Sequence, residues 1–123
     1  MIGTNDIDNI VGFNNDPATV IAQLDTLVTD IAVALPGAVI VLAKIIPITE
    51  HPDWSWMRPA YEALIAEIPD VAQKLADAGF KVKYVDMNST FLESELDDGV
   101  HPNAAGYKRM ADIWYQAIAD YLK

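Results

Sequence analysis

The sequence contains no cysteine, which excludes disulfide bonds, thiolate catalysis and zinc–sulfur sites. Histidine is almost absent as well: there are 2 among 123 residues, and they do not form a ligand spacing such as HExxH. We therefore expect no resident metal and no other cofactor. We interpret His51 as a surface residue rather than a metal ligand.

Positive charge is scarce, because 8 lysine and arginine residues stand against 18 aspartate and glutamate residues, for a formal net charge of -10. Binding to phosphate groups or to anionic lipid depends on contacts from cations. We therefore expect neither nucleic acid nor a membrane as partner. The longest apolar run, at residues 38–46, is interrupted by Lys44 and is too short to span a bilayer. The chain does not open like a signal peptide, so we expect any export signal to lie upstream of Met1, and the compartment is left open.

The length supports one domain over residues 1–123. Asp16-Pro17 suits the start of a helix, apolar residues then recur every three to four positions, and Pro36-Gly37 ends the pattern. The apolar, β-branched run at residues 38–46 follows. It predicts a parallel strand that is buried on both faces.

The second half of the chain continues this alternation. A helix is predicted from Pro59, with Pro69 kinking or splitting it, and Gly79 suits a left-handed C-terminal cap. Polar and apolar residues alternate in Lys81–Val85, which predicts an edge strand covered on one face. Asn103 suits the N-cap of a last helix. The whole order predicts an α/β domain with parallel strands, flanking helices and right-handed crossovers.

Two short motifs carry polar residues suited to catalysis: Gly3-Thr4-Asn5-Asp6 and Asp98-Gly99-Val100-His101-Pro102. Taken alone, each has an ordinary explanation, since an Asp–His pair is often a cap or a pair of solvated neighbours, and Gly, Asn and Asp form turns. Ligands of parallel sheets bind beyond the carboxyl ends of the strands. The fold therefore predicts that both motifs meet the loop at residues 47–58 at one edge of the sheet.

Together the two motifs resemble the last two catalytic blocks of the SGNH (GDSL-type) ester hydrolases, whose flavodoxin-like fold has strand order 2-1-3-4-5. The resemblance implies that His101 is the base, that Asp98 orients it and that Asn5 donates a hydrogen bond to the oxyanion. It covers essentially all 123 residues but corresponds to the C-terminal part of the family domain. We expect strands 4 and 5 to be complete and strand 3 to be reduced to Met1-Ile2.

The family's nucleophile is a serine in a Gly-Asp-Ser-like block, and this sequence contains no such block. Of the serines that are present, Ser55 and Ser94 could be recruited as nucleophiles, although neither matches by motif. Trp54 and Trp56 are candidate substrate-binding residues, because indole rings stack on sugar rings and acyl groups. Packing of these tryptophans onto the neighbouring helix is the alternative.

The C-terminal motif and the segment Ile45–Asp53 resemble most the carbohydrate acetyl-esterase branch, which implies a small-molecule or carbohydrate ester as substrate. Three hypotheses remain open: part of an SGNH esterase, inactive alone; a noncatalytic binding or assembly module that keeps half of the fold; and an enzyme whose serine comes from another chain. The strand at residues 38–46 would lack most of one neighbour. This predicts a homo-oligomer formed along that strand.

Overall fold

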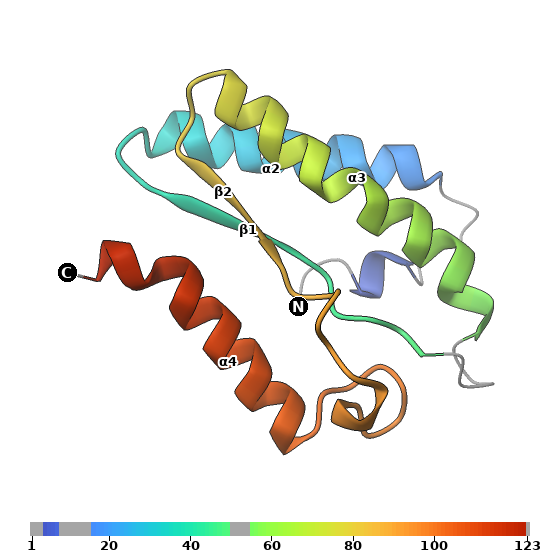
Figure 1. Ribbon diagram of the computed structural model, residues 1–123. Coiled ribbons are helices and arrows are strands. Elements are labelled where there is room, and N and C mark those ends of the chain that lie inside the picture. The colour runs from blue at the N-terminus through green and yellow to red at the C-terminus, as the bar shows by residue number, and fades with distance from the viewer. Residues whose placement is uncertain (1–3, 8–15, 50–54, 123) are drawn as a thin grey trace.

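The computed structural model describes residues 4–7, 16–49 and 55–122. Two parallel strands lie between layers of helices, with α2 and α3 over one face and α4 over the other (Figure 1). The elements are α2 (Pro17–Ala34), β1 (Ile40–Lys44), α3 (Arg58–Asp77), β2 (Val82–Asp86) and α4 (Ala104–Ile118), with 3-10 turns at Ser55–Met57, Glu93–Glu95 and Ala119–Tyr121. The predicted α/β order is confirmed. The strand expected at Met1-Ile2 lies outside the described residues.

Helix α2 begins as predicted, because the Asp16 side chain accepts a hydrogen bond from the N–H of Ala18 at 3.1 Å. Its buried residues are Val28 and Ala32, and Val28 shares an apolar cluster with residues of α3. The recurring apolar residues do not all face the core, since Leu27 and Ile31 of α2, and Leu35 just after it, are exposed. Helix α2 packs mainly against α3, so only the side that faces α3 is covered.

Helix α2 is long and rich in apolar residues. By length and apolar character it is the one helix among the described residues that could cross a membrane, with a hydropathy of 1.2 over 18 residues. A helix that packs within an α/β domain meets the same criterion. Its ion pair from Asp25 to Lys74 of α3, at 2.6 Å, joins it to the rest of the fold.

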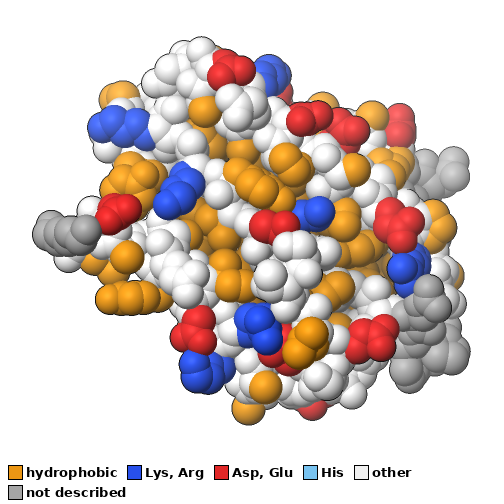
Figure 2. Space-filling model, viewed as in Figure 1, with side chains coloured by type: hydrophobic (Ala, Val, Ile, Leu, Met, Phe, Trp, Pro, Cys, Tyr) orange, Lys and Arg blue, Asp and Glu red, His pale blue; other side chains and the backbone are white. Residues whose placement is uncertain are grey.

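Strand β1 pairs with β2 in parallel register, with Ile40 opposite Val82 and Lys44 opposite Asp86. Alternate β1 residues pack toward the two helical layers, so the prediction that both faces are covered is right. The predicted full burial is wrong, since all five residues are half-buried. The reason is the narrow sheet, which has two strands in the described part of the chain. Figure 2 shows apolar side chains reaching the surface between the α3 layer and α4.

Strand β2 was expected to be covered on one face, and this expectation is wrong. Val82 and Tyr84 pack into the clusters on the α3 side, whereas Val85 belongs to the cluster on the α4 side. The alternation of polar and apolar residues suggested that Lys83 faces solvent. Its Nζ instead donates a hydrogen bond to the backbone oxygen of Ala117 at 2.8 Å, near the end of α4.

Helix α3 runs without a break through Pro69, so the predicted split does not occur. Proline removes one backbone hydrogen bond, but the turns on either side of it are held by buried residues, Ile68 and Val71 among them. The predicted cap at Gly79 is confirmed by its φ of 91°. The N–H groups of Gly79 and Phe80 return to the carbonyls of Ala76 and Leu75, which forms a Schellman motif.

Candidate active site

Asp98 and His101 lie together in the loop between β2 and α4, as the sequence predicts. Oδ2 of Asp98 is 2.7 Å from Nδ1 of His101. The other carboxylate oxygen, Oδ1, accepts hydrogen bonds from the backbone N–H groups of Val100, at 3.1 Å, and of His101, at 2.8 Å. One oxygen is therefore fixed by the main chain while the other meets the imidazole. Both side chains reach solvent, with 68% of the His101 side chain exposed.

These hydrogen bonds stabilise the ionised form of the carboxyl group. The backbone N–H of His101, followed by the His101 side chain and the N–H of Val100, lowers the pKa of Asp98 to about 2. Asp98 is therefore ionised at neutral pH and favours the imidazole tautomer with its proton on Nδ1. Nε2 of His101 is then the nitrogen that can accept a proton from a bound group.

The loop around this pair is closed on itself. Leu96 and Pro102 form an antiparallel bridge, and the N–H of Asp97 donates to the carbonyl of His101 at 2.8 Å. Gly99 turns the chain at a φ of 88°, a conformation that favours glycine. The carbonyl of Gly99 accepts a hydrogen bond from the N–H of Thr49 at 2.9 Å. The segment after β1 and the Asp98–His101 loop therefore meet at one edge, as the topology predicts.

Asn5 lies in a helical turn at residues 4–7 and is exposed. Two residues later, Ile7 is completely buried in an apolar cluster that also contains Ile45 and Val100. This cluster anchors the turn close to the loop of His101, because Val100 precedes that histidine directly. Whether the amide of Asn5 itself converges on the pair stays a prediction.

Of the two tryptophans predicted to bind substrate, Trp56 lies within the described residues and Trp54 does not. Trp56 lies in the turn Ser55–Met57 with 45% of its surface exposed, and its neighbour Met57 is buried in the same cluster as Ile7. An exposed indole on an anchored turn remains a candidate for ligand contact. Trp54 and His51 lie outside the described residues.

The candidate serines sit in exposed turns. Ser55 belongs to the turn with Trp56, and Ser94 to the turn Glu93–Glu95. The backbone oxygen of Ser94 accepts a hydrogen bond from Nδ2 of Asn103 at 2.8 Å, which fixes the main chain there. Ser55 shortly precedes α3 but does not directly follow β1, and Ser94 does not lead directly into a long helix, so neither lies in a strand-to-helix nucleophile turn.

A polar network at the ends of the two strands was not predicted. Nδ2 of Asn88 donates to the carbonyl of Ile45 at 2.8 Å and contacts the hydroxyl of Tyr61, while Oδ1 of Asp86 accepts from the N–H groups of Asn88 and Ser89. Burial raises the pKa of Tyr61 to about 12, so this phenol stays neutral. The sequence signal was an Asp-x-Asn turn directly after a strand.

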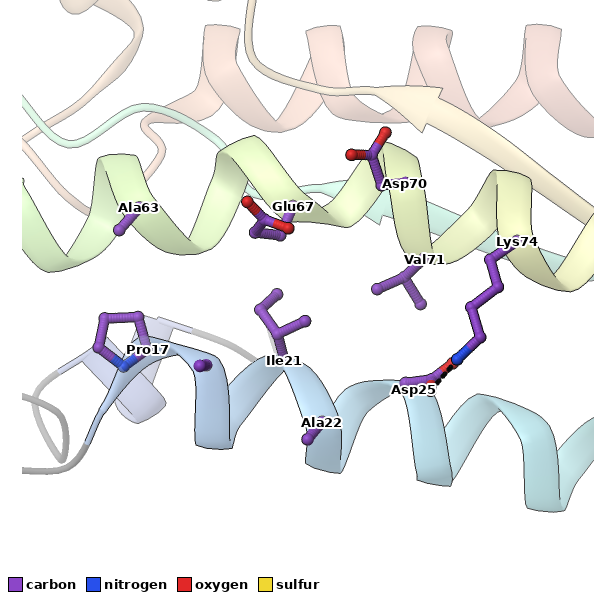
Figure 3. A pocket seen from close by; sticks show the side chains of 10 residues that line it. Pro17, Ile21, Ala22, Asp25, Ala63, Glu67, Asp70, Val71 and Lys74 are labelled. Carbon is purple, nitrogen blue, oxygen red and sulfur yellow. Dashed lines mark hydrogen bonds and ion pairs between the residues drawn. The ribbon is translucent and has the colours of Figure 1, made fainter.

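A groove lies away from the Asp98–His101 pair. A cavity of about 630 Å³ lies between α2 and α3, where Figure 3 shows Lys74 reaching across to Asp25. Neither Asp98 nor His101 lines it, since its walls are Pro17, Ala18, Ile21, Ala22, Asp25, Ala63, Glu67, Asp70, Val71 and Lys74. Within residues 4–7, 16–49 and 55–122, no three His, Asp or Glu side chains are grouped to hold a metal ion.

Known proteins resemble this chain over most of its length. A curated relative from Acetivibrio thermocellus, provisionally named endoglucanase X, is 30% identical over 103 residues, which are 81% of this chain and 42% of that protein. A multidomain esterase from Ruminococcus flavefaciens is 40% identical over 62 residues, or 48% of this chain and 8% of that protein. The chain thus spans less than half the length of these curated relatives.

A solved structure is also similar to this chain. The carbohydrate esterase family 3 protein from Talaromyces cellulolyticus superposes with a TM-score of 0.78 at 26% identity, over 98% of this chain and 56% of that one. The model of the GDSL-like lipase/acylhydrolase family matches residues 1–109. Because this match takes in both motifs and nearly the whole chain, the chain belongs to the GDSL-like lipase/acylhydrolase family.

Proposed function

We propose that this chain carries the histidine–aspartate part of a serine carboxylic ester hydrolase site, within a single hydrolase domain to which residues 1–123 belong. The observation that carries the proposal is the contact of 2.7 Å between Oδ2 of Asp98 and Nδ1 of His101. Hydrogen bonds from two backbone N–H groups to Oδ1 hold the carboxylate for this contact. A buttressed imidazole of this kind acts as a general base toward a hydroxyl nucleophile.

In the proposed mechanism, Nε2 of His101 takes the proton of a serine hydroxyl while the serine oxygen bonds to the ester carbonyl carbon. Asp98 stabilises the imidazolium, which then gives its proton to the departing alcohol oxygen as the acyl–oxygen bond breaks. A water molecule repeats the sequence and releases the acid. The amide of Asn5 donates a hydrogen bond to the oxyanion, a contribution worth roughly 10²–10³ in rate in other hydrolases.

The nucleophile is the missing part of this scheme. Residues 1–123 contain no Gly-Asp-Ser block. Ser55 and Ser94 lie in exposed turns, and neither is part of a Gly-Asp-Ser-like motif. We therefore propose that a polypeptide segment outside these 123 residues supplies the serine. The isolated chain is then inactive alone, because loss of a triad nucleophile costs on the order of 10⁶ in kcat.

The proposed substrate is a carbohydrate ester, such as an acetylated sugar. The names of the multidomain esterase and of the carbohydrate esterase structure support this choice. The exposed ring of Trp56 offers a stacking surface for a sugar. The endoglucanase name is not carried over, because glycoside hydrolysis uses two carboxyl groups, whereas the pair here is a carboxylate and an imidazole.

The direct test is to mix the chain with a family-type N-terminal segment that carries the Gly-Asp-Ser block. We expect hydrolysis of p-nitrophenyl acetate and of an acetylated xylo-oligosaccharide by the mixture, and loss of both activities with His101→Ala or with alanine at the supplied serine. Association of the two polypeptides without turnover would contradict the proposal. Sugar binding by the chain, measured by calorimetry without any turnover, would favour the noncatalytic binding module instead.

We also propose that the chain self-associates along β1. Ile40 donates its N–H to the carbonyl of Lys81, so the amides of Ile40, Leu42 and Lys44 point toward β2. The amides of Val41 and Ala43 point the other way, toward an edge that pairs with no strand in the described part of the chain. An apolar edge of this kind is a template for a further strand, and a second copy of β1 fits it.

A further inference from the structure

The loop that holds Asp98 and His101 is closed at its base by an ion pair between the buried side chain of Glu95 and the half-buried side chain of Arg109. Glu95 is the only charged residue that is buried among those the structure describes, with 7% of its surface exposed. Its two carboxylate oxygens lie 2.7 Å and 2.6 Å from Nε of Arg109, which belongs to α4. Oε2 also accepts a hydrogen bond from the N–H of Leu92 at 2.9 Å. Together these contacts join one end of the loop to the second turn of the helix.

The main chain of Glu95 is fixed as firmly as its side chain. Its carbonyl accepts a hydrogen bond from the N–H of Asn103 at 2.9 Å, which closes the loop. Asn103 also caps α4, since its Oδ1 accepts from the N–H groups of Ala105 and Gly106. The loop therefore begins and ends on the N-terminal turns of one helix, so its geometry depends on that helix.

The side chains of Asp98 and His101 are exposed, so the loop backbone has to hold them in place. The side chains of Asp98 and His101 are 46% and 68% exposed, so packing does little to orient them. Their arrangement depends on the backbone N–H groups of Val100 and His101, which hold Oδ1 of Asp98. A shift of the loop base would move these amides.

Stability alone does not account for the Glu95–Arg109 pair. Burying a charge is costly, and an apolar pair of similar volume often stabilises a fold as well or better. The pair ties the turn Glu93–Glu95 to α4, because the Glu95 carboxylate accepts hydrogen bonds from both the N–H of Leu92 and the guanidinium group of Arg109. The neighbouring pair of Lys108 and Asp112 is also short, at 2.6 Å, but it is solvent-exposed and lies within α4 itself.

We propose that Glu95 and Arg109 are positioning residues for the Asp98–His101 pair, because their ion pair fixes the base of the loop whose amides hold the Asp98 carboxylate. The catalytic meaning of this inference rests on the proposed ester hydrolase function. Its structural content does not, because the geometry of the pair can be measured without turnover.

The test compares Arg109→Ala with Lys108→Ala, which removes an adjacent cation of the same helix and serves as the matched control. NMR of the full chain follows the carboxyl titration of Asp98 and the imidazole carbon shifts of His101, which report the tautomer. Asp97→Asn separates the signals of the two adjacent carboxyl groups. In the unsubstituted chain we expect an Asp98 pKa of about 2 and the tautomer protonated on Nδ1.

With Arg109→Ala we expect the Asp98 pKa to rise toward the ordinary aspartate value and the tautomers to mix, while Lys108→Ala changes neither. Arg109→Lys, which keeps the charge, should restore the tautomer in part. Glu95→Gln keeps an acceptor for Leu92 and loses the ion pair, so it serves as a second variant if Arg109→Ala does not fold. Folded Arg109→Ala or Glu95→Gln with an unchanged Asp98 titration and an unchanged tautomer would overturn the inference.

A kinetic arm separates this inference from the proposed function. In the mixture with the serine-bearing segment, Arg109→Ala should lower kcat by on the order of 10²-fold with little change in KM, because misplacement affects the reacting geometry more than binding. Lys108→Ala should leave both parameters unchanged. If the unsubstituted mixture has no turnover, the proposed function fails, and the NMR comparison still decides the positioning role.

Discussion

The backbone oxygen of Glu95 occupies the space that a side chain at Gly106 would need: a Cβ at Gly106 would lie 2.3 Å from this oxygen. That separation is far below any ordinary carbon–oxygen contact. The same oxygen accepts the hydrogen bond from Asn103 that closes the loop. The absence of a side chain at position 106 therefore allows α4 to approach the base of the loop that carries Asp98 and His101.

We predict that Gly106→Ala destabilises the chain even though alanine favours helices. The gain in helix propensity is about 1 kcal/mol, whereas overpacking against fixed backbone costs about 1–3 kcal/mol and here also displaces a hydrogen-bonded carbonyl. Urea unfolding followed by circular dichroism measures the difference. Gly37→Ala is the control, because nothing lies within 4 Å of its Cβ position. Equal unfolding free energies for the two variants would refute the close approach.

The helices, strands and caps could be predicted from the sequence better than the packing of their side chains. The cap at Asp16 and the left-handed turn at Gly79 were predictable because each depends on residues close in sequence. The contact of Lys83 with the backbone of α4 was not, because tertiary packing decides what covers a strand face. Continuity of α3 through Pro69 has the same origin, since buried neighbours override a local preference.

In the candidate site, too, contacts between residues close in sequence were predictable and contacts between distant residues were not. The contact of Asp98 with His101 was predictable from a spacing of three residues and a recognisable motif. The pairing of Glu95 with Arg109 spans a loop and a helix, and nothing in either residue's local sequence indicates it. The contact of Tyr61 with Asn88 joins α3 to the segment after β2 and was missed for the same reason, although the Asp-x-Asn turn at residues 86–88 can be recognised in the sequence.

Acid should loosen the Asp98–His101 loop at a defined pH. The pKa of Asp98 in the folded chain is about 2, below the ordinary aspartate value of 3.8, so its contribution to stability is fully present above pH 4. That contribution is lost as the pH falls from about 4 through about 2. Asp98→Asn should flatten this part of the stability curve, measured by urea unfolding at a series of pH values. A parallel decline in both proteins would assign the acid sensitivity to other carboxyl groups.

Alkali should destabilise the chain through Tyr61. Burial raises its pKa from 10.0 to about 12, so between these values the unfolded chain loses a proton that the folded chain keeps. The free energy of unfolding should fall across this range by on the order of 3 kcal/mol, because each of the two pKa units corresponds to about 1.4 kcal/mol. Tyr61→Phe should remove most of the decline, and Tyr115→Phe, at an exposed tyrosine, should not. Absorbance at alkaline pH gives the ionisation directly.

The chain by itself should hydrolyse p-nitrophenyl acetate no faster than background, because a base without its nucleophile retains little catalysis. The pure chain is compared with Ser55→Ala, Ser94→Ala and His101→Ala. Turnover at ordinary enzyme rates that His101→Ala abolishes would contradict this prediction. Sensitivity to one of the two serine changes would then identify a recruited nucleophile.

The last prediction concerns self-association along β1. Light scattering at micromolar concentration should give an oligomer, since β1 has an unpaired apolar edge within the described chain and a two-stranded sheet is marginal alone. Val41→Pro should shift it toward monomer, because the amide of Val41 faces that edge and its loss leaves the β1–β2 hydrogen bonds intact. Ala43→Pro is a second variant with the same geometry. Leu42→Pro is the control that breaks the β1–β2 ladder and should unfold the chain. A folded monomer, or an oligomer that survives proline at both positions 41 and 43, would mean that β1 does not form the interface.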